Sequence, residues 1–210
     1  MVRKVEYALR LKGLAYDRDT AGIYRWRSKV LEHNPLGQIP ALSHGDFSIA
    51  GSSIICAYLE HLEPEPELVP SDLDAAARND WLVSLADGPM WDHVRSIWLA
   101  LIVGPLEGRQ PDDEALEYVT EGRTGLVGYY DELERHLSAP NAIGKGPFIV
   151  DARLRLADLA LAALITSMAH AGEVIDAARW PRLAVYEQTL LAVPVIAELF
   201  AETTEQVRVK

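Results

Sequence analysis

Hydrophobic residues change their spacing several times within the first sixty positions of the chain. Over residues 2–12 they follow a helical spacing up to Gly13, a pattern typical of a helix that ends at a glycine. Short apolar runs on either side of His44-Gly45 predict two strands joined by a tight turn. The expected elements are helices over about 2–12 and 24–33, strands over 41–43 and 47–49, and a helix over 52–62. This part of the chain therefore has a mixed α/β pattern.

Residues 63–70 carry the strongest boundary signal in the chain. They are Glu-Pro-Glu-Pro-Glu-Leu-Val-Pro, a composition that forbids regular pairing and favours an extended, solvated segment. We therefore predict a linker over 64–70, between an N-terminal domain over 1–63 and a C-terminal domain over 71–210.

After the linker the spacing of hydrophobic residues is helical throughout. Ser71, with Asp74 three positions later, predicts a capping box for a long helix that reaches about residue 102 and ends at Gly104-Pro105. The expected helices cover about 71–102, 112–137, 156–171, 181–192 and 194–205. The chain is thus predicted to be an α+β protein of two domains, a small α/β domain followed by an all-α helical bundle.

Composition narrows the range of partners. The chain has 210 residues, of which 49% are hydrophobic and 24% charged, as in an ordinary globular protein. Its net charge of −11 repels phosphate backbones, so we expect no nucleic-acid partner. The apolar stretch over 156–171 contains Asp158 and falls short of the roughly 20 residues of a membrane span, so it predicts a buried helix. A single cysteine, Cys56, and a start without a leader pattern favour the cytoplasm.

The most informative motif covers residues 34–42, Asn-Pro-Leu-Gly-Gln-Ile-Pro-Ala-Leu. With Ser52, Ile55 and Tyr58-Leu59 downstream, this motif resembles the glutathione transferase superfamily. The resemblance covers nearly the whole chain and includes the linker, Leu156-Ala157-Asp158, Trp180-Pro181-Arg182-Leu183 and Pro194. It implies a thioredoxin-like N-terminal domain followed by an all-helical C-terminal domain.

The motif also suggests where a ligand binds. If the bond before Pro40 is cis, the backbone N–H and C=O of Ile39 turn outward and can pair with a peptide-like ligand, as an added strand would. Ser52, expected to cap the helix over 52–62, lies where free N–H groups and the helix dipole favour a carboxylate. The resemblance implies that this carboxylate is the γ-glutamyl group of glutathione. The expected glutathione-binding residues are Ile39, Pro40, Gly51 and Ser52.

Three features depart from the family pattern. Gly51 stands where the family usually has Glu or Gln, and Arg155 stands where a Ser or Thr usually caps the helix over 156–171. The family's first strand is missing, and the Tyr, Ser or Cys at its end, which activates the thiol, is expected about two positions upstream of Met1. A start site placed too late, a rearranged sheet, or another chain that fills the gap would each account for this.

Other candidate groups are weaker. Tyr7 and Cys56 are more typical of packed side chains than of catalytic ones, and Arg3 could face an anion near the start of the first helix. The six histidines show no metal-ligand spacing, so no metal is predicted.

On the first long helix, the resemblance implies a pocket for a hydrophobic second substrate, with Met90, Trp91 and Arg95 as candidates. It also implies a homodimer in which the α/β domain of one chain meets the long helices of the other. Asp87 is the nearest candidate for an acidic residue that reaches the glutathione of the partner chain.

The resemblance leaves two alternative functions. One is a glutathione transferase active in detoxification, which conjugates, cleaves or reduces a hydrophobic electrophile with glutathione as cosubstrate. The other is a catalytically inactive protein of the same fold that acts through protein–protein contacts; Gly51, Arg155 and the absent first strand favour it.

Overall fold

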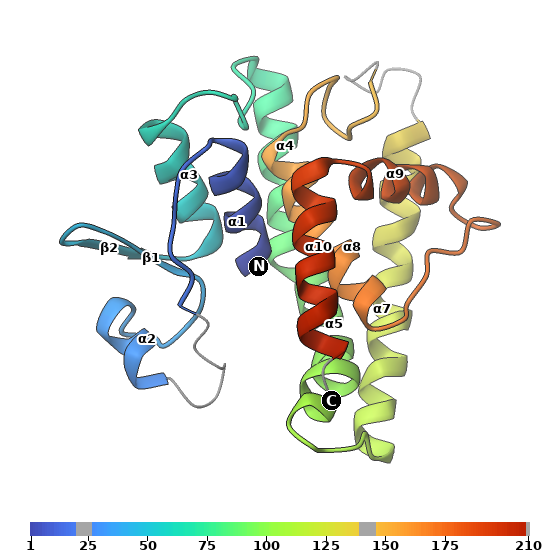
Figure 1. Cartoon of the computed structure of the whole chain (residues 1–210). Helices are drawn as coiled ribbons and strands as arrows, with labels where there is room; N and C mark the ends of the chain where they lie inside the picture. The colour runs from blue at the N-terminus through green and yellow to red at the C-terminus, as the bar shows by residue number, and fades with distance from the viewer. Residues whose placement is uncertain (20–26, 139–145, 209–210) are drawn as a thin grey trace.

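The computed structural model describes residues 1–19, 27–138 and 146–208, and it has the expected α+β architecture (Figure 1). The N-terminal elements are α1 (Val2–Leu11), α2 (Arg27–His33), β1 (Ala41–His44), β2 (Phe47–Ala50) and α3 (Ser52–Leu62). These bounds agree closely with the helices and strands expected there; the first residues of the helix expected over 24–33 lie outside the described residues.

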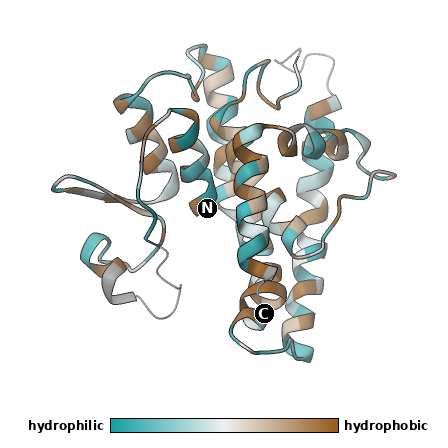
Figure 2. Ribbon diagram, in the orientation of Figure 1, coloured by the Kyte–Doolittle hydropathy of each residue, from teal (hydrophilic) through white to brown (hydrophobic). Residues whose placement is uncertain are grey.

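The C-terminal elements form a helical bundle (Figure 1). They are α4 (Leu73–Asp87), α5 (Pro89–Trp98), the π-helical turn η1 (Leu99–Val103), α6 (Gly104–Leu106), α7 (Asp113–Ser138), α8 (Leu156–His170), α9 (Pro181–Leu191) and α10 (Pro194–Arg208). Figure 2 shows hydrophilic and hydrophobic positions alternating along most of these helices. α8 differs, because its residues are buried from Leu156 to Met168. It is the centre around which the other helices pack.

The long helix expected over 71–102 is broken, which corrects the sequence-based prediction. α4 ends at Asp87, and Pro89 begins a new helix, because proline lacks the N–H that a continuing helix would need and fits the first turn of the next one. The expected cap at Ser71 is also wrong. Asp72 caps α4 instead, and its Oδ1 accepts a hydrogen bond from the N–H of Ala75 at 3.0 Å.

Close packing joins α5 to α7. A side chain at Gly122 would place its Cβ only 2.9 Å from the carbonyl oxygen of His93 and 3.0 Å from Ile97. Glycine at this position therefore lets the two helices approach.

The described residues contain a small antiparallel sheet, in which β1 pairs with β2 from Ala41–Ala50 to His44–Phe47. The hairpin extends away from the helical bundle in Figure 1. Within the described part of the chain, no single helix is long and apolar enough to cross a membrane. Only α9 and α10 together meet that length and composition, and they are bent by 84°.

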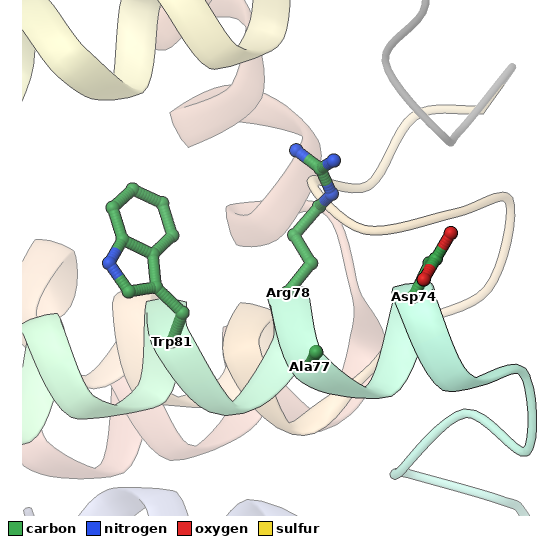
Figure 3. Close-up of a pocket in the computed structure, with 4 residues that line it drawn as sticks. All are labelled: Asp74, Ala77, Arg78 and Trp81. Atoms are coloured by element: carbon green, nitrogen blue, oxygen red, sulfur yellow. The ribbon is translucent and has the colours of Figure 1, made fainter.

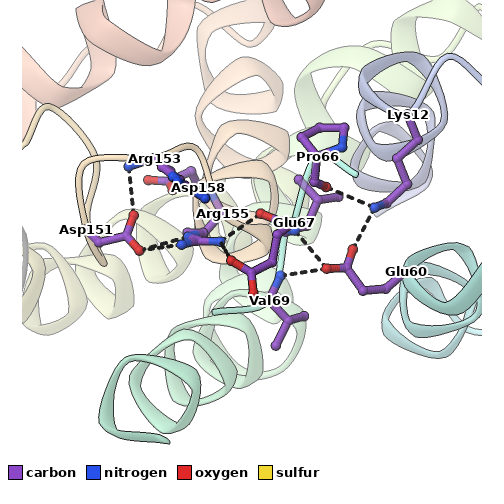
Figure 4. A network of polar contacts seen from close by, with 10 residues as sticks. Lys12, Glu60, Pro66, Glu67, Val69, Asp151, Arg153, Arg155 and Asp158 are labelled. Carbon is purple, nitrogen blue, oxygen red and sulfur yellow. Dashed lines mark hydrogen bonds and ion pairs between the residues drawn. The ribbon is translucent and has the colours of Figure 1, made fainter. Parts of the chain in front are cut away.

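The linker is bound to both parts of the fold (Figure 4). The expectation of a solvated segment holds for residues 64–66, which are exposed, whereas Leu68 and Pro70 are buried. The side chain of Lys12, at the end of α1, is fully buried. Its Nζ donates to the carbonyl oxygens of Glu63 at 2.7 Å and Pro66 at 3.0 Å, and it lies 2.7 Å from the carboxylate of Glu60. Proline removes backbone donors from this segment, but its carbonyl oxygens remain strong acceptors, and the buried lysine uses them.

A second set of contacts holds the other end of the linker. The carboxylate of Glu60 accepts hydrogen bonds from the N–H of Leu68 at 2.8 Å and of Val69 at 3.1 Å. The guanidinium of Arg155 binds both the carbonyl oxygen and the carboxylate of Glu67, each at 2.8 Å (Figure 4). Arg155 thus ties the linker to the start of α8 instead of capping that helix through its side chain.

The start of α8 is satisfied by a buried carboxylate. Asp158 accepts hydrogen bonds from the N–H groups of Arg155 at 2.7 Å and Ile149 at 3.0 Å, and from the hydroxyl of Tyr186 at 2.7 Å. Burial raises the pKa of Asp158 to about 6, although these hydrogen bonds act in the opposite direction. The amide oxygen of Asn79 accepts the N–H of Ala157 at 3.0 Å. Together these groups replace the missing Ser or Thr cap.

We predict that Asp158→Asn lowers the free energy of unfolding by about 2–3 kcal/mol. The NH₂ group of the new asparagine would face one of the two buried backbone N–H groups that donate to the Asp158 carboxylate, and that N–H would lose its acceptor. Urea denaturation followed by circular dichroism measures this. Asp113→Asn, the same change at an exposed position of α7, should alter the free energy by less than about 0.5 kcal/mol. Equal losses in the two variants would contradict this role of Asp158.

Candidate functional site

The candidate site lies where the loop before β1 meets the start of α3. The carbonyl oxygen of Pro40 accepts a hydrogen bond from the N–H of Gly51 at 3.1 Å. This contact places Ile39 and Pro40 beside Ser52, the first residue of α3. The structure thus brings together the four residues that the sequence suggested for glutathione binding. We call this place the junction site.

The loop that carries Ile39 is held by Asn34, which is 6% exposed. The Asn34 amide donates to the carbonyl oxygen of Gln38 at 2.7 Å and accepts from the N–H of Leu36 at 3.0 Å. The N–H of Gly37 donates to the Asn34 carbonyl oxygen at 2.8 Å. These bonds explain why the motif begins with asparagine: its side chain closes the turn.

The bond between Ile39 and Pro40 is cis, as expected. Ile39 is 45% exposed, and within the described residues no hydrogen bond uses its N–H or its C=O. Since backbone polar groups need partners, an exposed unpaired N–H and C=O on one residue can pair with an extended peptide.

The start of α3 corrects one detail of the sequence analysis. Gly51, with φ of +92°, is the cap residue, and Ser52 is the first helical residue; no side chain caps the helix. A positive φ is accessible to glycine at little cost, so this turn depends on Gly51. The first N–H groups of α3 remain available for an anion beside Ser52, which is 8% exposed.

Next to this helix start, a buried ion pair joins three helices. Lys4 on α1 is fully buried, and its Nζ lies 2.5 Å from Oδ2 of Asp87 on α4. Ser53 on α3 accepts a hydrogen bond from Lys4 at 2.9 Å and donates to the same Asp87 oxygen at 2.5 Å. The side chain of Asp87 is 22% exposed. Asp87, proposed from the sequence to reach a partner chain, is thus engaged within its own chain.

The sequence analysis did not identify Lys4 as a buried residue. The available signal was its position on α1, four residues before Ala8, which is also fully buried. A lysine on the buried face of α1 requires an acidic partner from another element, and nothing in the local sequence says which residue that is.

Tyr7 on α1 and Cys56 on α3 are both buried. Tyr7 is fully buried, with its hydroxyl 3.3 Å from that of Thr166. Cys56 is 2% exposed, and burial raises the pKa of its thiol to about 12. Both are structural, because neither offers an accessible nucleophile or acid at neutral pH.

Arg3 is different. Its guanidinium donates to the hydroxyl of Ser167 at 2.8 Å and lies over the ring of Trp98, 5.0 Å from the ring centre. Among the described residues it has no carboxylate within ion-pair distance. Burial lowers the pKa of Arg3, with opposing effects from Tyr7 and Glu6. Arg3 is therefore a partly buried cation close to the start of α1, as the sequence suggested.

The residues suggested for the second substrate do not form one surface. Met90 is 2% exposed and belongs to the core, Trp91 packs partly against that core, and Arg95 is exposed on α5. Two other hollows are found in the described structure. One, of about 350 Å³, is lined by Asp74, Ala77, Arg78 and Trp81 on α4 (Figure 3). The other, of about 230 Å³, lies among α7, α8 and α9. Within the described ranges, no cluster of His, Cys, Asp or Glu could hold a metal ion.

The two single substitutions in the Lys4–Asp87 ion pair should lower the free energy of unfolding by unequal amounts. Asp87→Ala leaves a buried ammonium without a counter-ion and should cost about 3–5 kcal/mol of unfolding free energy. Lys4→Met should cost less, since the side chain of Asp87 is 22% exposed and Ser53 still donates to its Oδ2. The double variant should be more stable than Asp87→Ala alone, as measured by urea denaturation of all four proteins. Additive losses would show that the two side chains do not interact.

Comparison with known proteins gives a consistent result. Residues 1–67 match the family model described as the N-terminal domain of glutathione S-transferase. Over 190 residues the chain is 30% identical to glutathione S-transferase theta-2B of Homo sapiens, covering 88% of this chain and 73% of the relative. It is 29% identical to glutathione S-transferase 1 of Dianthus caryophyllus, covering 86% and 77%.

Among solved structures, a glutathione S-transferase from Rhodospirillum rubrum F11 superposes with a TM-score of 0.82. The match covers 98% of this chain and 90% of that one at 22% identity, which supports the fold. A thioredoxin-like N-terminal part followed by a helical bundle is therefore the architecture of this chain.

Proposed function

This chain belongs to the glutathione S-transferase superfamily, and on that premise we propose that it binds glutathione at the junction site and transfers it to a hydrophobic electrophile. The observation that carries the proposal is the placement of the unpaired backbone of Ile39 beside the uncapped start of α3. The proposal keeps the division into a glutathione-binding domain over 1–63, a linker over 64–70 and a helical domain over 71–210.

Two parts of glutathione, its peptide backbone and its γ-glutamyl carboxylate, have a matching group in this proposal. Glutathione is a peptide, so the N–H and C=O of Ile39 can pair with its backbone as a neighbouring strand would. Its γ-glutamyl carboxylate fits the start of α3, where Ser52 and free N–H groups donate and the helix dipole favours negative charge. Gly51 supplies no carboxylate for the ligand's ammonium group.

The chemistry requires a thiolate. A thiol with a pKa of about 8.5 is only a few per cent ionised at neutral pH, and a shift of two units is worth about 2.7 kcal/mol. Tyr7 and Cys56 are buried, so we do not assign this role to either. The resemblance to the family implies a Tyr, Ser or Cys in this role.

A second candidate is a protein that has kept the fold and lost turnover, acting through protein–protein contacts. The glycine at position 51, in place of an acidic or amide anchor, favours it. Binding to immobilised glutathione together with turnover of an aryl halide supports the transferase. Binding without turnover, by a chain extended upstream of Met1, would support the second candidate.

We predict that Ser52→Ala weakens glutathione binding by about 1–2 kcal/mol, because a hydrogen bond to a carboxylate is lost. Isothermal titration calorimetry gives the dissociation constant, and thermal unfolding monitors the fold. Ser138→Ala, at the far end of α7, should leave binding unchanged. Lower stability with unchanged affinity per folded molecule would reduce Ser52 to a structural residue.

We also propose a homodimer that joins the α/β part of one chain to α4 of the other. Trp81 is 41% exposed beside the hollow on α4, where Nε of Arg78 is buried without a hydrogen-bond partner in the described structure (Figure 3). On the α/β part, Phe47 and Ile54 are 47% and 57% exposed. An apolar side chain in the hollow would cover Trp81, and a carbonyl oxygen would satisfy Arg78.

Light scattering over a dilution series should give the mass of two chains at micromolar concentration. Trp81→Glu should shift the mass towards one chain, because it places a charge in the hollow, whereas Tyr118→Glu on the exposed face of α7 should not. A folded wild-type monomer at all concentrations would overturn the dimer.

We propose a cytoplasmic location and a role in detoxification. A reducing compartment is compatible with the single, buried and unpaired Cys56.

A further inference from the structure

A cavity of about 230 Å³ lies on the helical part of the molecule, away from the junction site. α7, α8, α9 and the segment over 173–180 surround it; in Figure 1 α7 and α9 lie on the side of the bundle away from α1 and α3, with α8 in the middle of the bundle. Its lining residues are Arg123, Leu126, Val127, Tyr130, Ile165, Met168, Glu173, Val174, Ile175, Trp180 and Glu187. The proposed transfer reaction uses none of them.

The floor of the cavity is apolar and aromatic. Ile165 and Met168 come from α8, and Leu126 from α7. Tyr130 meets the ring of Trp180 edge to face, with the ring centres 5.2 Å apart. A cavity of about 150 Å³ can hold one benzene ring, so this one has room for a ring with a short polar arm.

The charges in the lining do not balance. Nε of Arg123 donates to the two carboxylate oxygens of Glu173 at 3.1 and 3.0 Å, so these residues neutralise each other. Glu187 has neither an ion pair nor a hydrogen bond among the described residues, and it is half-buried. The lining therefore carries one uncompensated negative charge.

The environment of Glu187 indicates what would compensate that charge. Burial raises the pKa of Glu187. The hydroxyl of Tyr130 has no hydrogen bond within the described structure, and burial, followed by the charge of Glu187, raises its pKa. A cation placed between them would gain a carboxylate and an oxygen acceptor, and it would lie near two aromatic rings.

We propose that this cavity binds a small primary amine that carries one aromatic ring, with its ammonium group on the carboxylate of Glu187 and its ring against Ile165, Met168 and Leu126. Tyr130 accepts a hydrogen bond from the same ammonium group, and Trp180 borders the ring. The structure thus assigns a second small-molecule site to the helical part of the chain. It is independent of glutathione transfer.

The test compares 2-phenylethylamine with 2-phenylethanol, which has the same ring and a neutral arm. Titrations of the full chain are followed by amide shifts in two-dimensional NMR, which detects millimolar dissociation constants. We expect the amine to bind at least tenfold more tightly than the alcohol, with shifts at Tyr130, Ile165 and Glu187. Equal affinities, or no binding of the amine, would overturn the proposal.

Glu187→Gln keeps the size of the side chain and removes its charge. We expect it to weaken binding of the amine about tenfold, which corresponds to about 1.4 kcal/mol, and to leave the alcohol within twofold. Glu117→Gln removes the same charge from an exposed position of α7 and should have no effect. Equal loss in both variants would overturn the assignment, since it would reflect only the net charge of the protein.

Tyr130→Phe provides a second variant in case the fold is sensitive at Glu187. It should reduce amine affinity by a smaller factor and leave the thermal unfolding temperature nearly unchanged. Amine affinity that is unaffected by either substitution would contradict the proposed binding mode.

Discussion

The structure depends on two fully buried lysines of α1, Lys4 and Lys12. Removing an ammonium from water costs several kcal/mol, so each lysine must be matched by a carboxylate and by further acceptors. Lys4 is matched by Asp87 of α4 and Ser53 of α3, and Lys12 by Glu60 of α3 and the carbonyl oxygens of the linker. α1 therefore connects the α/β part, the linker and the helical bundle.

This constraint explains why the junction site is well defined. Ser53 is part of the Lys4 network, and Ser52 precedes it at the start of α3. The same helix start is bonded through Gly51 to Pro40, next to Ile39. The groups offered to a ligand are thus held by a buried ion pair on one side and a backbone hydrogen bond on the other. Such an arrangement fixes binding groups before the ligand arrives, which lowers the entropic cost of binding.

Much of the fold could be predicted because its signals are local. The helix over 52–62 has the expected bounds, and the asparagine-led turn before Pro40 is encoded within a few residues. The break at Pro89 was also visible in the sequence, but the hydrophobic spacing continues through it and suggested a single helix. The composition of the linker did not reveal its binding partners, because Lys12 and Arg155 are far away in sequence.

The features that were missed are pairs formed over long distances along the chain. Lys4 and Asp87 are 83 positions apart, and Arg155 and Glu67 are 88 apart. The cavity beside Glu187 brings together residues from three helices and a loop, so no single segment carries its pattern. Within the candidate site, the sequence indicated Ile39, Pro40, Gly51 and Ser52, whereas the ion pair behind them required the fold.

The central claim is that glutathione lies along Ile39 with its γ-glutamyl carboxylate at the start of α3. An amide-shift map of the ¹⁵N-labelled chain titrated with glutathione tests it most directly. The account predicts saturable shifts centred on Ile39, Ala41, Gly51, Ser52 and Ser53, with little change in α7 and α9. Absence of shifts at millimolar glutathione, or shifts centred elsewhere in the chain, would contradict it.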